Sequence, residues 1–551
     1  MKRKLKMQIQ TLLLALIISQ RLWADDAPLR SPVNQVFQFT QAGTCTNWSD
    51  GSKNSAVANL WIPDDCVKLR GLLILCANVP EEKLASYPAV REVCASNDLG
   101  IVWCSSSFMN FARQQPGKKK MSEEYATSVG FLQELLNGLA KTSGYAEVAT
   151  VPWLPIGESG HLLMVDTLVE FSPERCLAGI WLKNNHLPPK NRQVPAFVVY
   201  GSAQEWGQTK TDIRTNWCNI TAAYAGILNG RKANPAWPLT YMIDGHSGHF
   251  DCSDRLADDV AHYIGLVAKA RLPGDGSAKL KPINITSGFV ADLPVPGHEG
   301  QAVKPAGTND GLPWFFDAAS AKEAQSYAAI NWKAETQLPA FLDEKEQPLK
   351  FDFNGISDLK TVVMGPDGIT FSLRAKLLDQ IPEEFVGAGG KLSKTPGEPK
   401  LEWLCGPIAP LGNGRFQIYL ERAGSTAYLA TRKNGTDTVR GIVQPLHINI
   451  NSFRNQEGKP QAITFDKIPD VTAGTKSVPL SAKSDSGLPV SYYVAVGPAM
   501  VMDGKIVFTG LPPRTKFPVT VTVAAWQWGR GAEPKVKTAS VIEQTFKILA
   551  R

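Results

Sequence analysis

The sequence has 551 residues, more than one ordinary domain contains, and this length predicts three or four domains. Hydrophobic residues make up 43% and charged residues 20%, which is typical of a globular protein and excludes a chain that is disordered throughout. The net charge is +7, but five basic residues lie within the first 24 residues, and without them it falls to +2. Charge therefore gives no reason to expect nucleic acid or an anionic membrane surface as a partner.

The first 24 residues have the pattern of a secretory signal peptide. Basic residues between Lys2 and Lys6 precede the apolar run Leu12–Ile18, and we expect cleavage after Ala24. An uncleaved anchor helix is the alternative, but the run is shorter than the roughly 20 residues that span a bilayer. We therefore expect an exported protein, periplasmic or extracellular, with no membrane span after the signal is removed.

Apolar runs alternate with helix-like stretches between residues 55 and 270. The runs are Val57–Ile62, Leu69–Cys76, Gly100–Cys104, Val151–Ile156, Leu177–Leu182, Ala196–Tyr200 and Leu239–Ile243. The helix-like stretches are Glu82–Ser96, Glu123–Leu139, Leu162–Phe171, Thr211–Leu228 and Asp254–Ala270. Apolar strands that alternate with amphipathic helices predict a mostly parallel sheet with helices on both faces. We assign this α/β domain to residues 30–275.

The chain beyond this domain favours β structure. Residues 280–458 contain short alternating strands, turn signals and one expected helix, Ala318–Ala329, and predict a β-rich domain of unknown role. Residues 461–551 alternate more regularly, which is typical of an Ig-like β-sandwich. This last segment contains no cysteine, so no disulfide is expected between its sheets.

The candidate nucleophile lies where an apolar run meets a helix-like stretch. Val151–Ile156 leads into Gly157-Glu158-Ser159-Gly160-His161, and the helical pattern begins directly afterwards. A strand, a sharp turn with serine at its apex and a helix form a nucleophile elbow, in which the helix N-terminus directs amide dipoles at the site. The usual pattern is G-x-S-x-G. Gly160 follows Ser159 here, but His161 replaces the last glycine, which normally permits close packing of helix and strand.

A serine hydroxyl needs a base to accept its proton, and the base needs an orienting acid. In this architecture the acid follows the strand two after the elbow, and the histidine follows the last strand. Glu205 lies at the first place, with Asp212 and Asp244 as alternatives. His246 and His249 lie at the second, and His249 is favoured because it adjoins the start of the closing helix.

Residues 55–270 resemble the α/β-hydrolase superfamily, in particular secreted serine esterases similar to polyhydroxybutyrate depolymerases and dienelactone hydrolases. The resemblance rests on Leu69–Leu75, Gly157–His161 and Gly248–Phe250. The C-terminal segment resembles bacterial Ig-like modules through Ile463–Phe465 and Ser486–Val490.

The resemblance implies an oxyanion hole built from backbone amides. One amide belongs to Gly160, the residue after the nucleophile, and the other lies in the loop after Leu75, where Asn78 or Val79 would supply it. We favour Asn78. The His-Gly motif of the family is absent from this loop.

The sequence also indicates an open substrate site. Few residues separate Leu182 from Val194, so no large cap domain is expected, and an open groove suits a bulky or polymeric substrate. Phe108, Phe111 and Trp206 fall in loops at the carboxyl ends of the strands, where α/β sheets bind ligands. They are candidates for stacking on a sugar or phenolic ring, and ordinary loop anchoring is the alternative.

Together these features predict an exported carboxylic-ester hydrolase that acts on an ester-bearing polysaccharide or polymer through Ser159, His249 and Glu205. No metal or organic cofactor is expected. A non-catalytic binding or adhesion protein that keeps the hydrolase scaffold is one alternative. A serine peptidase is another, because a triad does not distinguish esters from amides. The oligomeric state stays open.

The cysteines leave one specific hypothesis. There are nine, so at least one thiol is unpaired, and none are spaced as CxxC, which argues against a cysteine zinc or redox site. Export permits disulfides. A bridge between Cys218 and Cys252 would hold the histidine loop against the sheet, and two unrelated buried thiols are the alternative.

Overall fold

The computed structural model describes the chain from residue 35 onwards, with several gaps. The described residues are 35–46, 53–105, 121–183, 187–188, 192–202, 208–210, 212–214, 219–245, 247–274, 279–352, 354–360, 362–420 and 426–551. The expected signal peptide lies outside them. Among the helices in these ranges, none is both long and apolar enough to cross a bilayer.

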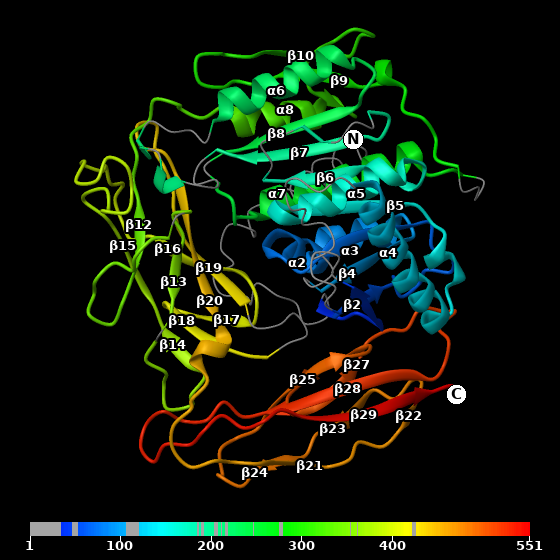
Figure 1. Cartoon of the computed structure of the whole chain (residues 1–551), viewed down its shortest axis with the longest axis vertical. Coiled ribbons are helices and arrows are strands. Elements are labelled where there is room, and N and C mark those ends of the chain that lie inside the picture. Colours follow the sequence, from blue (N-terminus) through cyan, green and yellow to red (C-terminus); the bar gives the residue numbers. More distant parts are fainter. Residues whose placement is uncertain are drawn as a thin grey trace, which may run out of the picture.

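An eight-stranded sheet forms the centre of the molecule (Figure 1). Its order is β1-β2-β4-β3-β5-β6-β7-β8. The strands are β1 (Phe39–Thr46), β2 (Lys53–Trp61), β3 (Gly71–Cys76), β4 (Leu99–Cys104), β5 (Trp153–Glu158), β6 (Gly179–Leu182), β7 (Ala196–Gly201) and β8 (Leu239–Asp244). β1 and β2 are antiparallel, and β3 to β8 are parallel to one another. The prediction of a mostly parallel sheet is therefore confirmed, and this arrangement fits the α/β-hydrolase fold.

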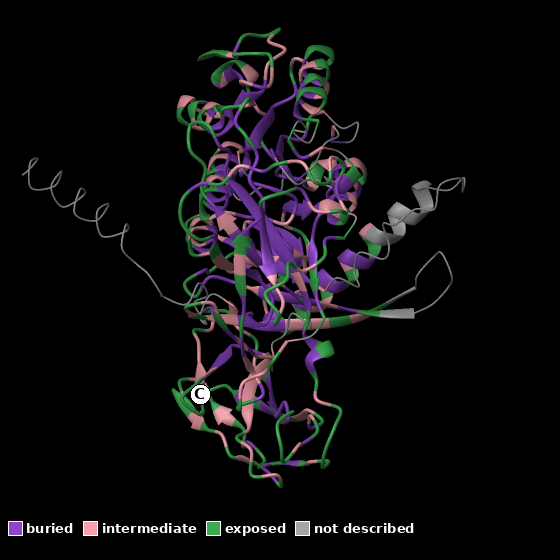
Figure 2. Ribbon diagram, turned by 90° about the vertical axis from the view of Figure 1, so that its left-hand side faces the viewer, coloured by how far each residue is buried: buried purple, intermediate pink, exposed green. Residues whose placement is uncertain are grey.

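Burial explains why the strands are continuous apolar runs in the sequence. All residues of β3 to β8 are buried, because helices cover the sheet. Figure 2 shows these central strands as one buried layer. The helices are α2 (Val79–Ser86), α3 (Pro88–Ser96), α4 (Met121–Ser143), α5 (Leu162–Phe171), α6 (Ile220–Ala233) and α7 (Asp254–Arg271).

Two of the expected helices differ from the structure. The stretch Glu82–Ser96 is two helices, α2 and α3, which meet at Tyr87. Pro88 explains the break, because proline favours the first turn of a helix and holds the preceding residue in extended conformation. The helix expected at Thr211–Leu228 begins later in the structure, at Ile220, and ends at Ala233.

Residues 285–328 join the large sheet at its β8 edge. They form the small sheet of β9 (Phe289–Asp292), β10 (Gln301–Pro305) and β11 (Trp314–Phe315), followed by α8 (Ala318–Ala328). The helix α8 packs on β8, and its buried face belongs to the same apolar core as the sheet.

Small, mostly antiparallel sheets follow. We call residues 339–450 the middle β part. Its sheets are β12 (Pro339–Leu342) with β15 (Arg374–Leu377); β13 (Ser357–Leu359), β20 (Ile442–Asn449), β19 (Thr426–Lys433) and β16 (Lys400–Cys405); and β14 (Thr370–Ser372), β18 (Arg415–Ile418) and β17 (Ile408–Gly412). Its buried side chains form a second apolar core.

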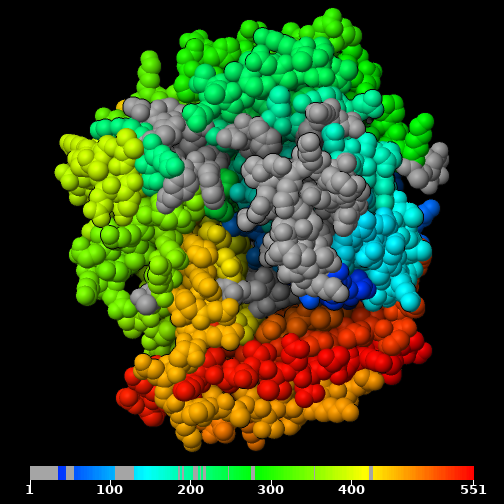
Figure 3. All heavy atoms as spheres, in the orientation of Figure 1, coloured from blue at the N-terminus to red at the C-terminus, as the bar shows by residue number. Residues whose placement is uncertain are grey.

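The C-terminal segment contains three further sheets. They are β21 (Ile463–Phe465) with β24 (Ala482–Ser484); β22 (Val471–Thr472), β29 (Ile542–Leu549), β28 (Val519–Trp526) and β25 (Ser491–Val496); and β23 (Ser477–Pro479), β27 (Lys505–Phe508) and β26 (Ala499–Met502). This segment contacts the α/β part, where Arg514 pairs with Glu147 at 2.8 Å. Figure 3 shows the α/β, middle and C-terminal parts packed together on one face of the molecule.

Candidate active site

The elbow around Ser159 has the tight geometry that the sequence predicts. β5 ends at Glu158, a single 3₁₀ turn covers Ser159–His161, and α5 follows directly. Ser159 has a φ of 53°, a left-handed conformation that is uncommon for a residue with a side chain. Such conformations cost about 1–3 kcal/mol and cluster at functional sites. A Cβ atom on Gly157 would lie 2.5 Å from the His161 carbonyl oxygen, so the turn requires glycine there.

His161, which replaces the last glycine of the usual pattern, links the elbow to α2. Its Nδ1 atom lies 2.9 Å from Oε1 of Glu81, and only 9% of the residue is exposed. The same Glu81 oxygen accepts a hydrogen bond of 2.9 Å from the backbone amide of Glu158. The contact with Glu81 holds His161 in place. Replacement of the last glycine of the pattern by histidine therefore leaves the elbow intact.

The structure brings together Ser159, which follows β5, and His249, which follows β8, although β6 and β7 lie between these two strands in the sheet. Nε2 of His249 lies 2.8 Å from Oγ of Ser159. His249 is 7% exposed and sits in the loop between β8 and α7, and its ring meets the ring of Phe250 edge to face at 4.7 Å. The closing helix is fixed at its start, because the Ser253 side chain accepts a hydrogen bond from the amide of Leu256. A proton can pass directly from the serine hydroxyl to the imidazole.

Glu158 is a site residue that the sequence analysis does not single out. Its Oε1 atom lies 3.3 Å from Nε2 of His249, and its residue is fully buried. Its other carboxylate oxygen accepts a hydrogen bond from the side-chain amide of Asn78. A signal was present, because a carboxylate that ends a fully apolar strand is rarely buried without a function or a partner.

Two aspartates that the sequence analysis keeps as alternative acids have cationic partners. Asp244, at the end of β8, lies 2.6 Å from Nζ of Lys183, and both side chains are almost completely buried. Asp212 binds the guanidinium of Arg214, which holds the pKa of that carboxyl below its usual value through their hydrogen bond. Glu205 and His246 lie outside the described residues.

The loop after β3 contains both residues that were expected to supply the second oxyanion amide, Asn78 and Val79, and the structure distinguishes between them. The backbone amide of Asn78 donates to the Cys76 carbonyl at 3.0 Å, so this donor already has a partner. Val79 is the first residue of α2, and the amide at this position has no acceptor within its own helix. Gly160 follows the serine within the 3₁₀ turn and is exposed. Gly160 and Val79 are therefore the two backbone candidates.

The expected stacking residues and the expected disulfide between Cys218 and Cys252 remain to be located. Phe108, Phe111, Trp206 and Cys218 lie outside the part of the chain that the structure describes. Cys252 is a buried free thiol, so it takes part in no disulfide in this structure. Burial raises the pKa of its thiol to about 12, which keeps it protonated and unreactive.

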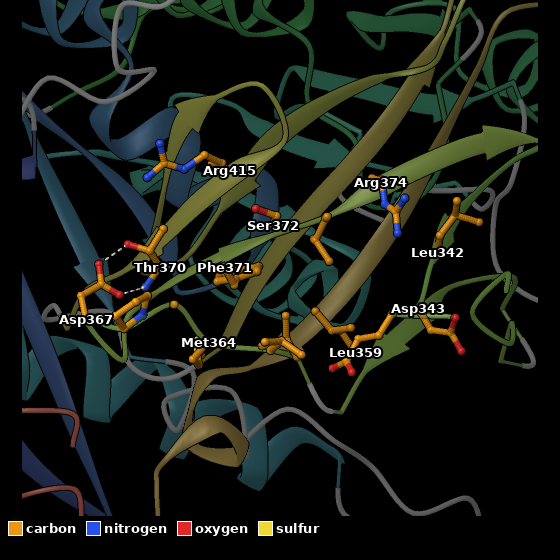
Figure 4. Close-up of a pocket in the computed structure, with 16 residues that line it drawn as sticks. Leu342, Asp343, Leu359, Met364, Asp367, Thr370, Phe371, Ser372, Arg374 and Arg415 are labelled. Atoms are coloured by element: carbon orange, nitrogen blue, oxygen red, sulfur yellow. Dashed lines mark hydrogen bonds between the residues drawn. The ribbon is translucent and has the colours of Figure 1, made fainter. Parts of the chain in front are cut away.

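One cavity lies away from Ser159 and His249. It has a volume of about 520 Å³ and belongs to the middle β part (Figure 4). Phe371 and Leu359 contribute apolar surface, while Arg374 and Arg415 stand on either side of Ser372 in this view. Neither Ser159 nor His249 lines it, so it is separate from the candidate active site.

Comparison with known proteins gives structural neighbours but no family. No family model matches the chain, and no curated protein matches it either. Among solved structures, it is similar to poly(aspartic acid) hydrolase-1 from Sphingomonas sp. KT-1, at 14% identity over 41% of this chain and 98% of that one, with a TM-score of 0.29. It is also similar to an S-formylglutathione hydrolase from Agrobacterium tumefaciens, at 10% identity over 44% and 98%, with a TM-score of 0.28. A third neighbour is the esterase domain of a Rhodothermus marinus protein, at 12% identity over 42% and 98%, with a TM-score of 0.25.

Proposed function

We propose that this chain is a serine hydrolase that cleaves carboxylic esters, with Ser159 as nucleophile and His249 as general base. The hydrogen bond of 2.8 Å between Oγ and Nε2 carries the proposal, because it joins a serine on a strained elbow to a base from a distant loop. The buried surroundings add to this support. Electrostatic interactions are stronger where water is excluded, and His249 is 7% exposed.

The proposed reaction has two symmetrical halves. Nε2 of His249 takes the hydroxyl proton as Oγ of Ser159 attacks the ester carbonyl, and the protonated imidazole then gives that proton to the departing alcohol. Water repeats the sequence on the acyl-enzyme, which releases the carboxylic acid and frees the serine. The amides of Gly160 and Val79 donate to the oxyanion, and removing one such donor typically costs about 3–4 kcal/mol of transition-state stabilisation.

We assign the orienting acid to Glu205, following the β7 strand, and give Glu158 a second electrostatic role. The Glu158 carboxylate lies 3.3 Å from the nitrogen that becomes charged during the reaction. A buried negative charge at that distance stabilises the imidazolium ion as it forms. Asn78 holds the carboxylate in place through its side-chain amide.

The proposed substrate is an ester-bearing polysaccharide or polymer. The short connection from β6 to β7 supports an open site, and Phe108, Phe111 and Trp206 are the proposed stacking residues. The proposed setting is outside the cytoplasm, because residues 1–24 have the features of a signal peptide. Residues 461–551 are proposed to be an Ig-like module.

A peptidase is the second candidate activity, because the same serine and histidine would also attack an amide.

Hydrolysis of a panel of acetyl, feruloyl and methyl esters, with a peptide amide in parallel, tests the proposed function. We expect turnover of at least one ester by the wild-type protein and none by Ser159→Ala. Cleavage of the amide alone would replace the esterase by a peptidase. If the folded protein turns over none of these substrates, a binding protein on a hydrolase scaffold becomes the better description.

A further inference from the structure

The two segments that flank Ser159 both reach into the middle β part. One is α2, which carries the candidate oxyanion donor Val79. The side chain of Val79 is 2% exposed and belongs to the apolar core of the middle β part, not to that of the large sheet. α2 also packs against β16, and the Glu82 carboxylate accepts a hydrogen bond of 3.1 Å from the amide of Gly406. Figure 1 shows α2 at the boundary between the two parts.

The other segment is the loop that carries His249, at residues 245–253. Asp251 in this loop is 2% exposed, and its Oδ1 atom lies 2.9 Å from the guanidinium of Arg432 on β19. Arg432 is held in turn by Glu402 on β16, at 2.8 Å. The loop is thus tied to two neighbouring strands of the middle β part.

A second set of contacts ties the same loop to the large sheet. Oδ2 of Asp251 accepts a hydrogen bond of 2.8 Å from Ser247, and Ser247 accepts one of 2.9 Å from Nζ of Lys183. Lys183 also pairs with Asp244 at the end of β8. Asp251 therefore stands between a cation of the sheet and a cation of the middle β part. Burial acts to raise its pKa, but Arg432 and Lys183 outweigh burial, so the pKa is lowered and the carboxylate stays charged.

Aromatic rings connect the same two parts beside the base. Phe250 meets His249 edge to face and stacks on Tyr428 of β19, with ring centroids 5.2 Å apart and an interplanar angle of 14°. Tyr428 contacts the ring of His447 on β20 at 5.2 Å. Two residues of β19, four positions apart, thus hold adjacent residues of the histidine loop. Tyr428 contacts Phe250 through their rings, and Arg432 forms the ion pair with Asp251.

We infer that Arg432 is a positioning residue for His249, and that the middle β part is an integral half of the active site and not an appended module. This inference rests on the proposed function. Catalysis requires the base and the oxyanion donors to be fixed within a fraction of an ångström, and the base and one of these donors, Val79, lie on segments anchored in the middle β part. Arg432 acts through Asp251 and touches no reacting atom, so its loss should affect turnover more than substrate binding.

Three substitutions test the inference, with hydrolysis of p-nitrophenyl acetate and labelling of Ser159 by a fluorophosphonate probe as readouts. Arg432→Met removes the guanidinium and leaves Lys183, which reaches Asp251 through Ser247, as the remaining cation that lowers the pKa of this carboxylate. Arg432→Met combined with Asp251→Asn removes both charges, so the fold is spared while the tether is lost. The guanidinium of Arg432 bonds both Asp251 and Glu402. Arg432→Lys keeps the positive charge but loses the hydrogen bond to Glu402. Arg374→Met is the matched control, because Arg374 forms an exposed ion pair with Glu346 within the same part.

We expect the double variant to keep the wild-type melting temperature, with kcat and the labelling rate lower by about tenfold or more and KM changed by less than about twofold. Arg432→Lys should recover part of the loss, and Arg374→Met should match the wild type. Wild-type kcat in a folded double variant, or in Arg432→Met, would overturn the inference. If Arg432→Met does not fold, the double variant and Arg432→Lys decide. If the wild-type protein itself fails to label, the proposed function fails, whereas equal labelling of wild type and double variant overturns only the inference.

Discussion

The side-chain amide of Asn78 donates a hydrogen bond to the carboxylate of Glu158, the residue directly before Ser159. Asn78 follows β3 and Glu158 is the last residue of β5, and these two strands pair in parallel with Leu72 opposite Trp153. Their hydrogen bond therefore joins the loop that supplies an oxyanion donor to the elbow that supplies the nucleophile. It also directs the Glu158 carboxylate toward His249.

Glu158→Gln removes the negative charge beside the base while keeping the size of the side chain. We expect kcat to fall by about tenfold, because the imidazolium ion formed in the reaction loses a buried counter-charge. Steady-state kinetics with a neutral ester measure this loss. A kcat identical to that of the wild type would show that Glu158 has only a structural role.

Ser159→Ala removes the proposed nucleophile and should abolish ester hydrolysis. The backbone strain at this position stays the same, because alanine also has a Cβ atom, so the melting temperature should be nearly unchanged. Steady-state kinetics and thermal unfolding by circular dichroism measure the two quantities. Retention of one tenth of wild-type turnover would rule out Ser159 as the nucleophile.

His249→Ala should be as damaging as Ser159→Ala, because the members of a triad act as a unit. The matched control is His262→Ala. His262 lies on α7 and pairs with Asp317 at the surface, so its loss should leave kcat unchanged. Comparison of kcat for the two variants gives the answer. Comparable losses in both would mean that general destabilisation, and not loss of the base, explains the effect.

Gly157→Ala tests the geometry of the elbow. A Cβ atom there would lie 2.5 Å from the His161 carbonyl oxygen and 2.9 Å from Cγ2 of Val165, and the first neighbour is backbone that cannot move without disturbing the turn. We expect a loss of about 2–3 kcal/mol of unfolding free energy and of most ester hydrolysis. Gly226→Ala on α6, where a Cβ atom meets nothing within 4 Å, is the control. Equal stability of the two variants would contradict the tight turn.

The pH dependence of stability tests the charge of Asp251. Its lowered pKa means that its ionised form stabilises the fold above the unfolded pKa of about 4, and this contribution is lost as the pH falls through the folded pKa. In Arg432→Met, one of the two cations that lower the pKa of Asp251 is missing, so burial raises this pKa. Ionisation of Asp251 then destabilises the fold. The loss of stability should therefore be largest near pH 7, about 3 kcal/mol, and smaller near pH 4.

Chemical denaturation of wild type and Arg432→Met across this pH range measures the difference. Arg374→Met, with its exposed ion pair, should show a small loss at every pH. A loss in Arg432→Met that is independent of pH would mean that Asp251 does not respond to Arg432.

Local patterns in the sequence were sufficient to predict the sheet and the elbow. β3 and β5 are continuous apolar runs because both faces are covered, and the Gly157–His161 turn lies directly between a strand and a helix. The contact between α2 and the elbow was not predictable in the same way. It depends on the pairing of β3 with β5, which are about 80 residues apart, as the separation of Asn78 and Glu158 shows.

The sequence contains even less that indicates the role of the middle β part. Asp251 and Arg432 are 181 positions apart, and neither residue belongs to a motif. A loop aspartate and a strand arginine have ordinary sequence patterns, and only the packing of β19 against the histidine loop brings these two residues together as an ion pair. Glu158 was missed for a related reason: the elbow pattern leaves its position unspecified.

Covalent labelling with a fluorophosphonate probe, followed by mapping of the modified peptide, measures the reactivity of Ser159 directly. Such probes react with a serine only when a neighbouring base activates it, and His249 lies 2.8 Å away. We expect a single modification on the peptide that contains Ser159 in the wild-type protein, and no modification in Ser159→Ala or His249→Ala. A folded wild-type protein that stays unlabelled, or that is labelled at another serine, would contradict the assignment of Ser159 and His249 as the catalytic pair.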